Sequence, residues 1–92
     1  MRISKKEREE LAALINAHHV ADIMKREFQE KVRELQKKDS FDPEEEEYER
    51  AVESVGRWQE RGFRTEIELA EKYGIELPGL KWARDLIGSI DR

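Results

Sequence analysis

Three segments with the spacing of a helix-capping box constrain the fold of this chain more than any other feature. They are Ser4-Lys5-Lys6-Glu7, Asp42-Pro43-Glu44-Glu45 and Thr65-Glu66-Ile67-Glu68. Each places a capping side chain three residues before a glutamate, so that both can satisfy free backbone N–H groups in a first helical turn. Gly62, Gly74 and Gly88 each follow an amphipathic run and are predicted to end a helix. No segment alternates with a period of two, so the sequence predicts an all-α fold.

These signals predict four helices, at about 4–38, 43–61, 65–73 and 78–88, within a single domain spanning residues 1–92. The first two helices would form a long antiparallel hairpin, because only a short connection separates them. Residues 1–38 carry a net charge of +3 and residues 39–55 a net charge of −7. Opposite charges of this kind attract two antiparallel helices. The two short helices are expected to pack against the hairpin.

The first helix is predicted to be apolar on more than one side. One stripe contains Leu14, Ala17, Ala21, Met24, Phe28 and Leu35, whereas Leu11, Ile15, Val20 and Ile23 lie off it. At 1.5 Å per residue such a helix spans about 50 Å, yet a compact chain of this length is only about 32 Å across. Either the helix breaks near residues 16–19 or a second chain covers the overhang. We expect a second chain, and thus a dimer formed through Leu11, Leu14, Ile15, Val20, Ile23, Met24 and Phe28.

Candidate catalytic and metal-binding groups are few. His18, His19 and Asp22 could suggest a metal, but neighbouring side chains on a helix diverge by about 100° and no second histidine-containing segment exists. Glu45, Glu49 and Glu53 recur every four residues and could hold Mg²⁺, but the basic first helix would oppose them, so a solvated face is expected. The chain has no cysteine and no glycine-rich phosphate loop. The sequence therefore predicts no catalytic residue, no cofactor and no metal.

Most of the aromatic bulk in the second half comes from Trp58, Phe63, Tyr73 and Trp82. Such residues are favoured binding anchors, but a thin core also needs them, and core packing is expected. Abundant Glu, Lys and Arg with few amides fits either a thermophilic source or long solvated helices.

Residues 65–88, TEIELAEKYGIELPGLKWARDLIG, resemble a helix-turn-helix DNA-binding unit. Ala70, Gly74, Ile75 and Leu80 stand where that motif has its small residue, its turn glycine and its two apolar residues. The resemblance implies that the second helix would enter the major groove, with Glu76, Lys81 and Arg84 nearest the DNA. Lys81 and Arg84 are the DNA-binding residues that it implies.

Two functional hypotheses follow from these features. The first is a small non-enzymatic protein-interaction module, such as an adaptor, an inhibitor or a viral-type accessory protein, that acts as a homo-oligomer and binds an unidentified protein partner. Its acidic segment 39–53 could contact a basic patch. The alternative is a DNA-binding regulator that uses residues 65–88. We prefer the first, because the net charge is −4 and phosphate neutralisation drives most DNA affinity. No apolar run reaches the roughly 18 residues of a membrane span, and a cytoplasmic location is expected.

Overall fold

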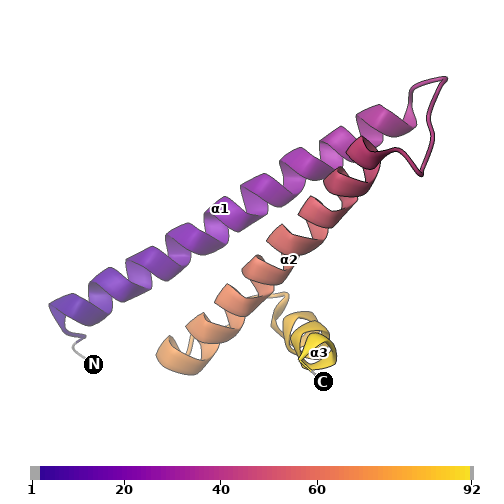
Figure 1. Cartoon of the computed structure of the whole chain (residues 1–92). Helices are drawn as coiled ribbons and strands as arrows, with labels where there is room; N and C mark the ends of the chain where they lie inside the picture. The colour runs from indigo at the N-terminus through magenta and orange to yellow at the C-terminus, as the bar shows by residue number, and fades with distance from the viewer. Residues whose placement is uncertain (1–2, 92) are drawn as a thin grey trace.

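The computed structural model describes residues 3–91 and consists of three helices, α1 (Lys5–Gln36), α2 (Glu46–Tyr73) and α3 (Leu80–Ile90). The described residues contain no strand, so the predicted all-α fold is confirmed. Helices α1 and α2 form the expected long hairpin, and α3 lies against α2 (Figure 1).

Helix α1 is one continuous helix of 32 residues. The backbone N–H of Glu7 donates to the Ser4 hydroxyl at 3.1 Å, which confirms Ser4 as the N-cap, while the Glu7 carboxylate accepts from the Ser4 hydroxyl at 3.3 Å instead of from the Ser4 backbone N–H. No break occurs near residues 16–19, and the helix ends at Gln36 rather than residue 38. The described residues extend over 58 × 28 × 19 Å with a radius of gyration of 16.4 Å, against about 12 Å for a compact chain of this length. The molecule is elongated because both long helices are, and α1 does not overhang α2, since the Tyr73 hydroxyl at the end of α2 donates to the Glu7 carbonyl near the start of α1 at 3.2 Å.

Helix α2 begins three residues later than the second capping box predicts. Asp42 caps a turn instead of the helix, because its carboxylate accepts from the N–H of Glu44 at 2.9 Å and its carbonyl from the N–H of Glu45 at 3.1 Å. The first helical residue is Glu46, and its N-cap, Glu45, makes no side-chain capping bond.

The predicted break between residues 61 and 65 is wrong, because α2 runs through it without interruption. Gly62 stands in the helix interior, where a Cβ would lie 3.7 Å from the Cβ of Ala21 on α1. The Thr65 hydroxyl donates to the carbonyl of Arg61 at 2.8 Å, as hydroxyls inside helices do. The predicted helices 43–61 and 65–73 are thus one element. Gly62 lies where the two long helices approach each other, and Thr65 caps nothing.

The predicted stop at Gly74 is confirmed, whereas the stop at Gly88 is wrong. Gly74 has φ +67°, and its N–H donates to the carbonyl of Ala70 at 3.0 Å, which is the αL motif of a helix C-terminus. Helix α3 starts at Leu80 rather than 78 and continues through Gly88 to Ile90.

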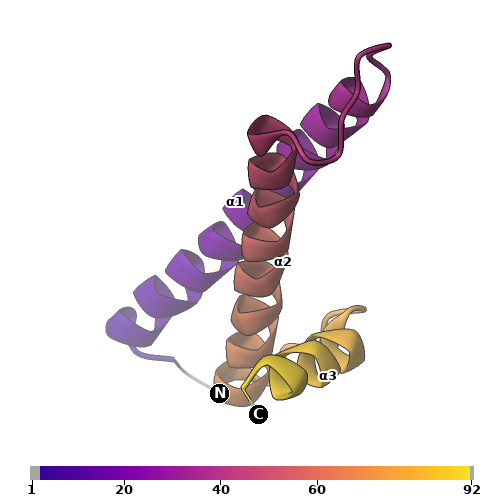
Figure 2. The ribbon, with the colours of Figure 1, turned by 45° about the vertical axis from the view of Figure 1, so that its right-hand side comes forward.

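The buried side chains form a narrow strip along the contacts between the helices and do not form one compact core. Leu14 and Phe28 lie seven residues on either side of the buried Ala21, on the α1 face that packs on α2. The six buried hydrophobic residues are Ala21, Leu35, Ala51, Leu69, Ala83 and Ile87. An ion pair of 3.6 Å between Lys31 and Glu47 confirms the predicted attraction between the basic and the acidic segments. Among the described residues α3 contacts α2 and not α1, and Figure 2 shows it projecting from the hairpin.

Candidate interaction surfaces

A polar contact joins α1 to α2 beside the start of α3. Nε2 of His18 on α1 lies 2.9 Å from Oε1 of Glu66 on α2. The Glu66 side chain is only 12% exposed, and a Cβ on Gly79, the N-cap of α3, would lie 3.1 Å from its Oε2. A carboxylate beside the N-terminus of a helix is favoured by the helix dipole. The contact therefore stabilises the pairing of α1 with α2, whereas the second carboxylate oxygen, Oε2, is buried beside Gly79 without a hydrogen-bond partner among the described residues.

The residues considered for a metal have other partners. His18 contacts Glu66, and Asp22 pairs with Arg26 at 3.2 Å and with Lys25 at 3.9 Å, while His19 is exposed. Within residues 3–91 no group of three or more metal-binding side chains comes together. The carboxylates at 45, 49 and 53 are exposed, and Glu53 pairs with Arg57 at 3.7 Å.

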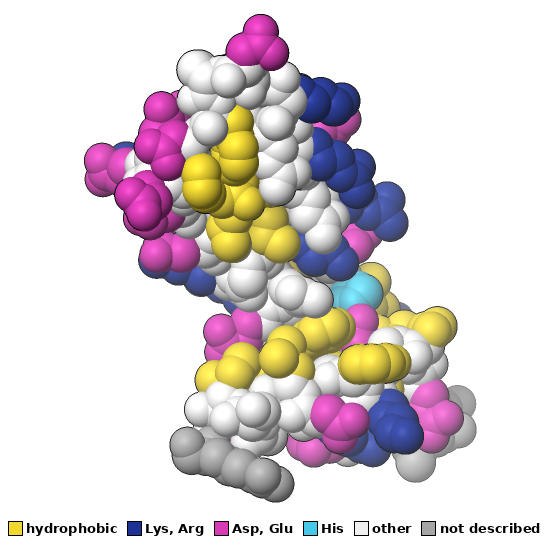
Figure 3. Space-filling model, turned by 90° about the vertical axis from the view of Figure 1, so that its right-hand side faces the viewer, with side chains coloured by type: hydrophobic (Ala, Val, Ile, Leu, Met, Phe, Trp, Pro, Cys, Tyr) yellow, Lys and Arg dark blue, Asp and Glu magenta, His cyan; other side chains and the backbone are white. Residues whose placement is uncertain are grey.

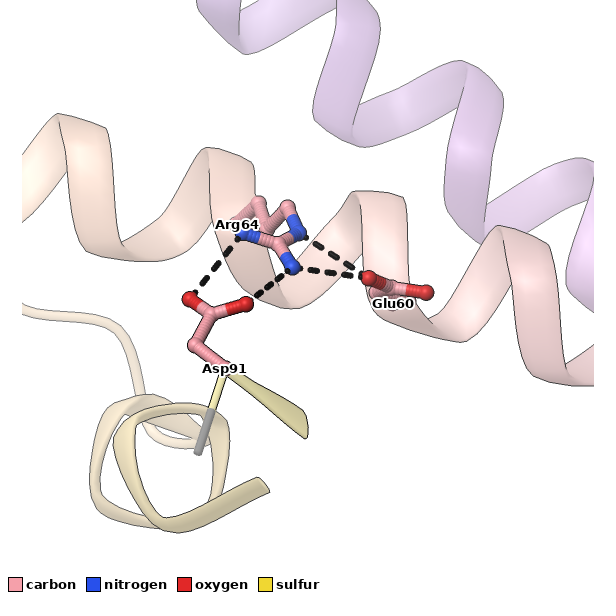
Figure 4. Close-up of polar contacts among 3 residues, drawn as sticks. All are labelled: Glu60, Arg64 and Asp91. Atoms are coloured by element: carbon pink, nitrogen blue, oxygen red, sulfur yellow. Dashed lines mark hydrogen bonds and ion pairs between the residues drawn. The ribbon is translucent and has the colours of Figure 1, made fainter. Parts of the chain in front are cut away.

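An arginine clamp fastens the far end of α3 to α2 (Figure 4). Arg64 lies between two carboxylates. Its Nη2 donates to Asp91 Oδ1 and to Glu60 Oε1, each at 2.9 Å. Hydrogen bonds to Asp91 and then to Glu60 raise the pKa of Arg64. The contact is solvent-exposed, so it fixes the orientation of α3 more than it stabilises the fold.

The outer face of α1 is the first uncovered apolar surface. It contains Ile15, Val20 and Ile23, with Ile15 51% exposed. These side chains lie away from the line through Leu14, Ala21 and Phe28 that packs on α2. Of the seven predicted self-association residues, Leu11, Leu14, Met24 and Phe28 are half-buried within the monomer. The structure therefore leaves three of the seven free for a second chain.

The second uncovered surface, the corner face, combines α3 with the hairpin. Trp82, Leu86 and Ile90 follow one another every four residues along α3, and Trp82 is 75% exposed. On the hairpin, a shallow cavity of about 330 Å³ is lined by Val32, Val52 and Val55, with Gln29, Arg33 and Gln36. Figure 3 shows hydrophobic side chains gathered over the hairpin and over α3, with a hollow and a histidine between them.

The exposure of Trp82 overturns its expected place in the core. Trp58, Phe63 and Tyr73 are half-buried, but Trp82 is the most exposed of the large hydrophobic residues. The sequence contains a pattern that predicts the exposure of Trp82. The spacing Trp82, Leu86, Ile90 forms a second apolar stripe beside Ala83 and Ile87, so α3 has a wider apolar arc than one neighbouring helix can cover.

The residues that resemble a helix-turn-helix are distributed over α2, a connector and α3. Ala70 and Leu80 are half-buried, Gly74 makes the turn, and Lys81 and Arg84 are exposed. The connector from 74 to 79 is six residues long, compared with the three or four typical of that motif.

Comparison with known proteins identified no relative. The chain matches no known protein family, no curated protein and no solved structure. Within the described residues, no helix combines the length and the apolar character needed to cross a membrane.

Proposed function

We propose that this chain is a non-enzymatic helical interaction module that associates with a second copy of itself and binds another protein. The observation that carries the proposal is the distribution of large apolar side chains. Seven of them are exposed within residues 3–91, whereas only Leu35, Leu69 and Ile87 among the large ones are buried. A domain this small is marginal alone, and covering exposed apolar area supplies stability.

The corner face suits a protein partner. An inside corner between a helix and a hairpin offers two walls to an amphipathic segment. Trp82 stands at its edge, and tryptophan is among the residues that most often dominate binding energy. Clusters of exposed apolar side chains of this kind mark interaction sites more often than isolated ones.

Affinity capture from the native cell, with matched variants, tests this function. Leu86→Glu places a charge in the apolar stripe of α3, whereas Arg84→Glu places a glutamate at an exposed position on the opposite side of the same helix. We expect a defined partner to be recovered with the parent chain and Arg84→Glu and lost with Leu86→Glu. Equal recovery with all three chains, or no recovered partner, would contradict the proposal.

A second candidate is DNA binding through α3, supported by the exposure of Lys81 and Arg84. A dimer would then have to present two α3 helices about 34 Å apart, to match successive major grooves. The decisive measurement is an electrophoretic mobility shift at about 50 mM salt, where weak electrostatic binding is strongest. Retardation that disappears in the Lys81→Ala/Arg84→Ala variant would favour this candidate. We expect no retardation.

A further inference from the structure

Eight exposed residues form a regular line along the outer face of α1. They are Lys5, Glu9, Ala12, Asn16, His19, Ile23, Arg26 and Glu30. Their separations alternate between four and three residues, which is the spacing of a coiled-coil seam. The line lies opposite the side that packs on α2, and among the described residues α3 does not approach α1. A second helix therefore has unobstructed access to the whole line (Figures 1 and 2).

The residues of the line are complementary to the same residues of a second, antiparallel copy. About a midpoint between residues 17 and 18, equidistant positions pair Lys5 with Glu30 and Glu9 with Arg26. Closer to the midpoint, Ala12 pairs with Ile23 and Asn16 with His19. Each of the four pairs joins opposite charges, two apolar residues or two polar residues.

A parallel arrangement lacks this complementarity. It would bring each residue of the line against its own copy, so Glu9 would meet Glu9 and Arg26 would meet Arg26. Four of the eight positions would then join like charges, which is unfavourable at a helix interface. The charge pattern thus selects the antiparallel orientation as well as the register.

We propose that the outer face of α1 binds the α1 helix of a second copy of this chain, antiparallel, with the two-fold axis passing between Ala17 and His18. This assignment rests on the proposed function and names the surface and geometry of its self-association. Ile15, Val20 and Ile23 become covered near the axis, and the charged pairs lie toward the ends of a contact about 38 Å long. Arg26, which pairs with Asp22 at 3.2 Å in the monomer, gains Glu9 of the second copy as a further carboxylate.

The polar pair at the centre fixes the register. Asn16 and His19 are the only uncharged polar residues of the line, and each would meet the other twice across the axis. Polar residues in a coiled-coil seam specify register at a cost in stability. The association is therefore reversible and of moderate affinity, and both helices keep their packing on α2.

Charge-reversal variants test the pairing, with the association of the full chain measured by sedimentation equilibrium. Glu9→Arg and Arg26→Glu each place like charges together twice per dimer, and we expect each to weaken association at least about tenfold. The double variant restores opposite charges and should recover most of the affinity. Glu71→Arg, an equal charge change on an exposed part of α2, serves as the control and should leave association unchanged. Circular dichroism establishes that each variant remains helical.

Disulfide formation tests the orientation, since the chain has no cysteine of its own. An equimolar mixture of Ala12→Cys and Ile23→Cys chains should form a disulfide-linked heterodimer on mild oxidation. Ala12→Cys alone should not, because its two thiols would lie about 16 Å apart along the antiparallel helices. Efficient linkage of Ala12→Cys with itself would overturn the antiparallel orientation.

The outcomes separate this inference from the proposed function. A dimer that responds to none of the charge changes would overturn the assigned surface and leave self-association standing. A folded monomer at every concentration would overturn both the assignment and self-association. The capture experiment at Leu86 then decides the remaining part of the function independently.

Discussion

Gly79 lies against the carboxylate of Glu66, so closely that a Cβ added to it would come within 3.1 Å of Oε2. We expect Gly79→Ala to destabilise the fold by about 1 kcal/mol through overpacking, because the carboxylate must move away from its contact with His18. Gly88→Ala, in the open interior of α3, should instead stabilise by up to about 1 kcal/mol. Urea denaturation measures both changes.

The Glu66→Ala background provides the control for this prediction. Without the carboxylate, Gly79→Ala should lose its penalty, since the three atoms nearest the added Cβ all belong to the Glu66 carboxyl group. An unchanged penalty in that background would show that the cost arises in the connector and not from Glu66.

Gly62→Ala distinguishes a helix interior from a helix end. Since the added Cβ would lie at an ordinary van der Waals distance of 3.7 Å from Ala21, we expect stabilisation of roughly 0.5–1 kcal/mol. Gly74→Ala should destabilise by roughly 1 kcal/mol, because φ there is +67°. Thermal unfolding of the two variants compares them directly, and destabilisation of both would contradict a continuous α2.

Tyr73 should make the fold sensitive to alkaline pH. Its hydroxyl donates to the carbonyl of Glu7 at 3.2 Å, and burial followed by the charge of Glu10 raises its pKa. Because its pKa is raised in the folded state, Tyr73 contributes fully to the stability of the fold below the unfolded-state pKa of about 10. This contribution is lost as the pH rises through the pKa of the folded state. We expect Tyr73→Phe to be less stable than the parent chain near neutral pH and to lose stability less steeply above pH 10.

Tyr48→Phe is the matched control for that experiment. The Tyr48 hydroxyl accepts from Gln36 at 3.2 Å and has no carboxylate among its hydrogen-bonding partners. The change removes a tyrosine hydroxyl elsewhere on the hairpin without altering the surroundings of Tyr73. An equal effect of both variants would contradict the assigned role of Tyr73.

The arginine clamp should control the fraying of α3. We expect Asp91→Asn to increase hydrogen exchange of the last-turn amides of α3 while leaving the amides of α1 unaffected, because Arg64 joins α3 to α2 alone. Asp85→Asn, a similar change on an exposed site of the same helix, should not increase it. Protection factors measured by NMR compare the two variants.

The sequence predicted the parts of the fold that local chemistry determines. Ser4 caps α1, Gly74 ends α2, and the charge asymmetry of the hairpin appears in the contact between Lys31 and Glu47. These features depend on residues close in sequence or on the net charge of whole segments, so spacing and composition are sufficient to find them.

The errors arise where tertiary contact outweighs local preference. The sequence predicts a helix end at Gly62, but this residue lies where α1 and α2 approach each other. It also predicts an N-cap at Thr65, but the Thr65 hydroxyl donates to the Arg61 carbonyl in the preceding turn. The contact between His18 and Glu66 joins residues 48 positions apart, so no local spacing reveals it. Trp82 was assigned to the core because a thin core needs aromatic bulk, but α3 has only one neighbouring helix to pack against.

The position of Glu66 has a thermodynamic consequence for the two proposed binding surfaces. The outer face of α1 and the corner face share no side chain, but the Glu66 carboxylate lies between α1 and the start of α3, with Oε1 2.9 Å from His18 and Oε2 beside Gly79. Coupling between two ligands requires that each one bias a conformational equilibrium that the other also senses. Any coupling between the two surfaces is therefore expected to depend on the placement of this one carboxylate.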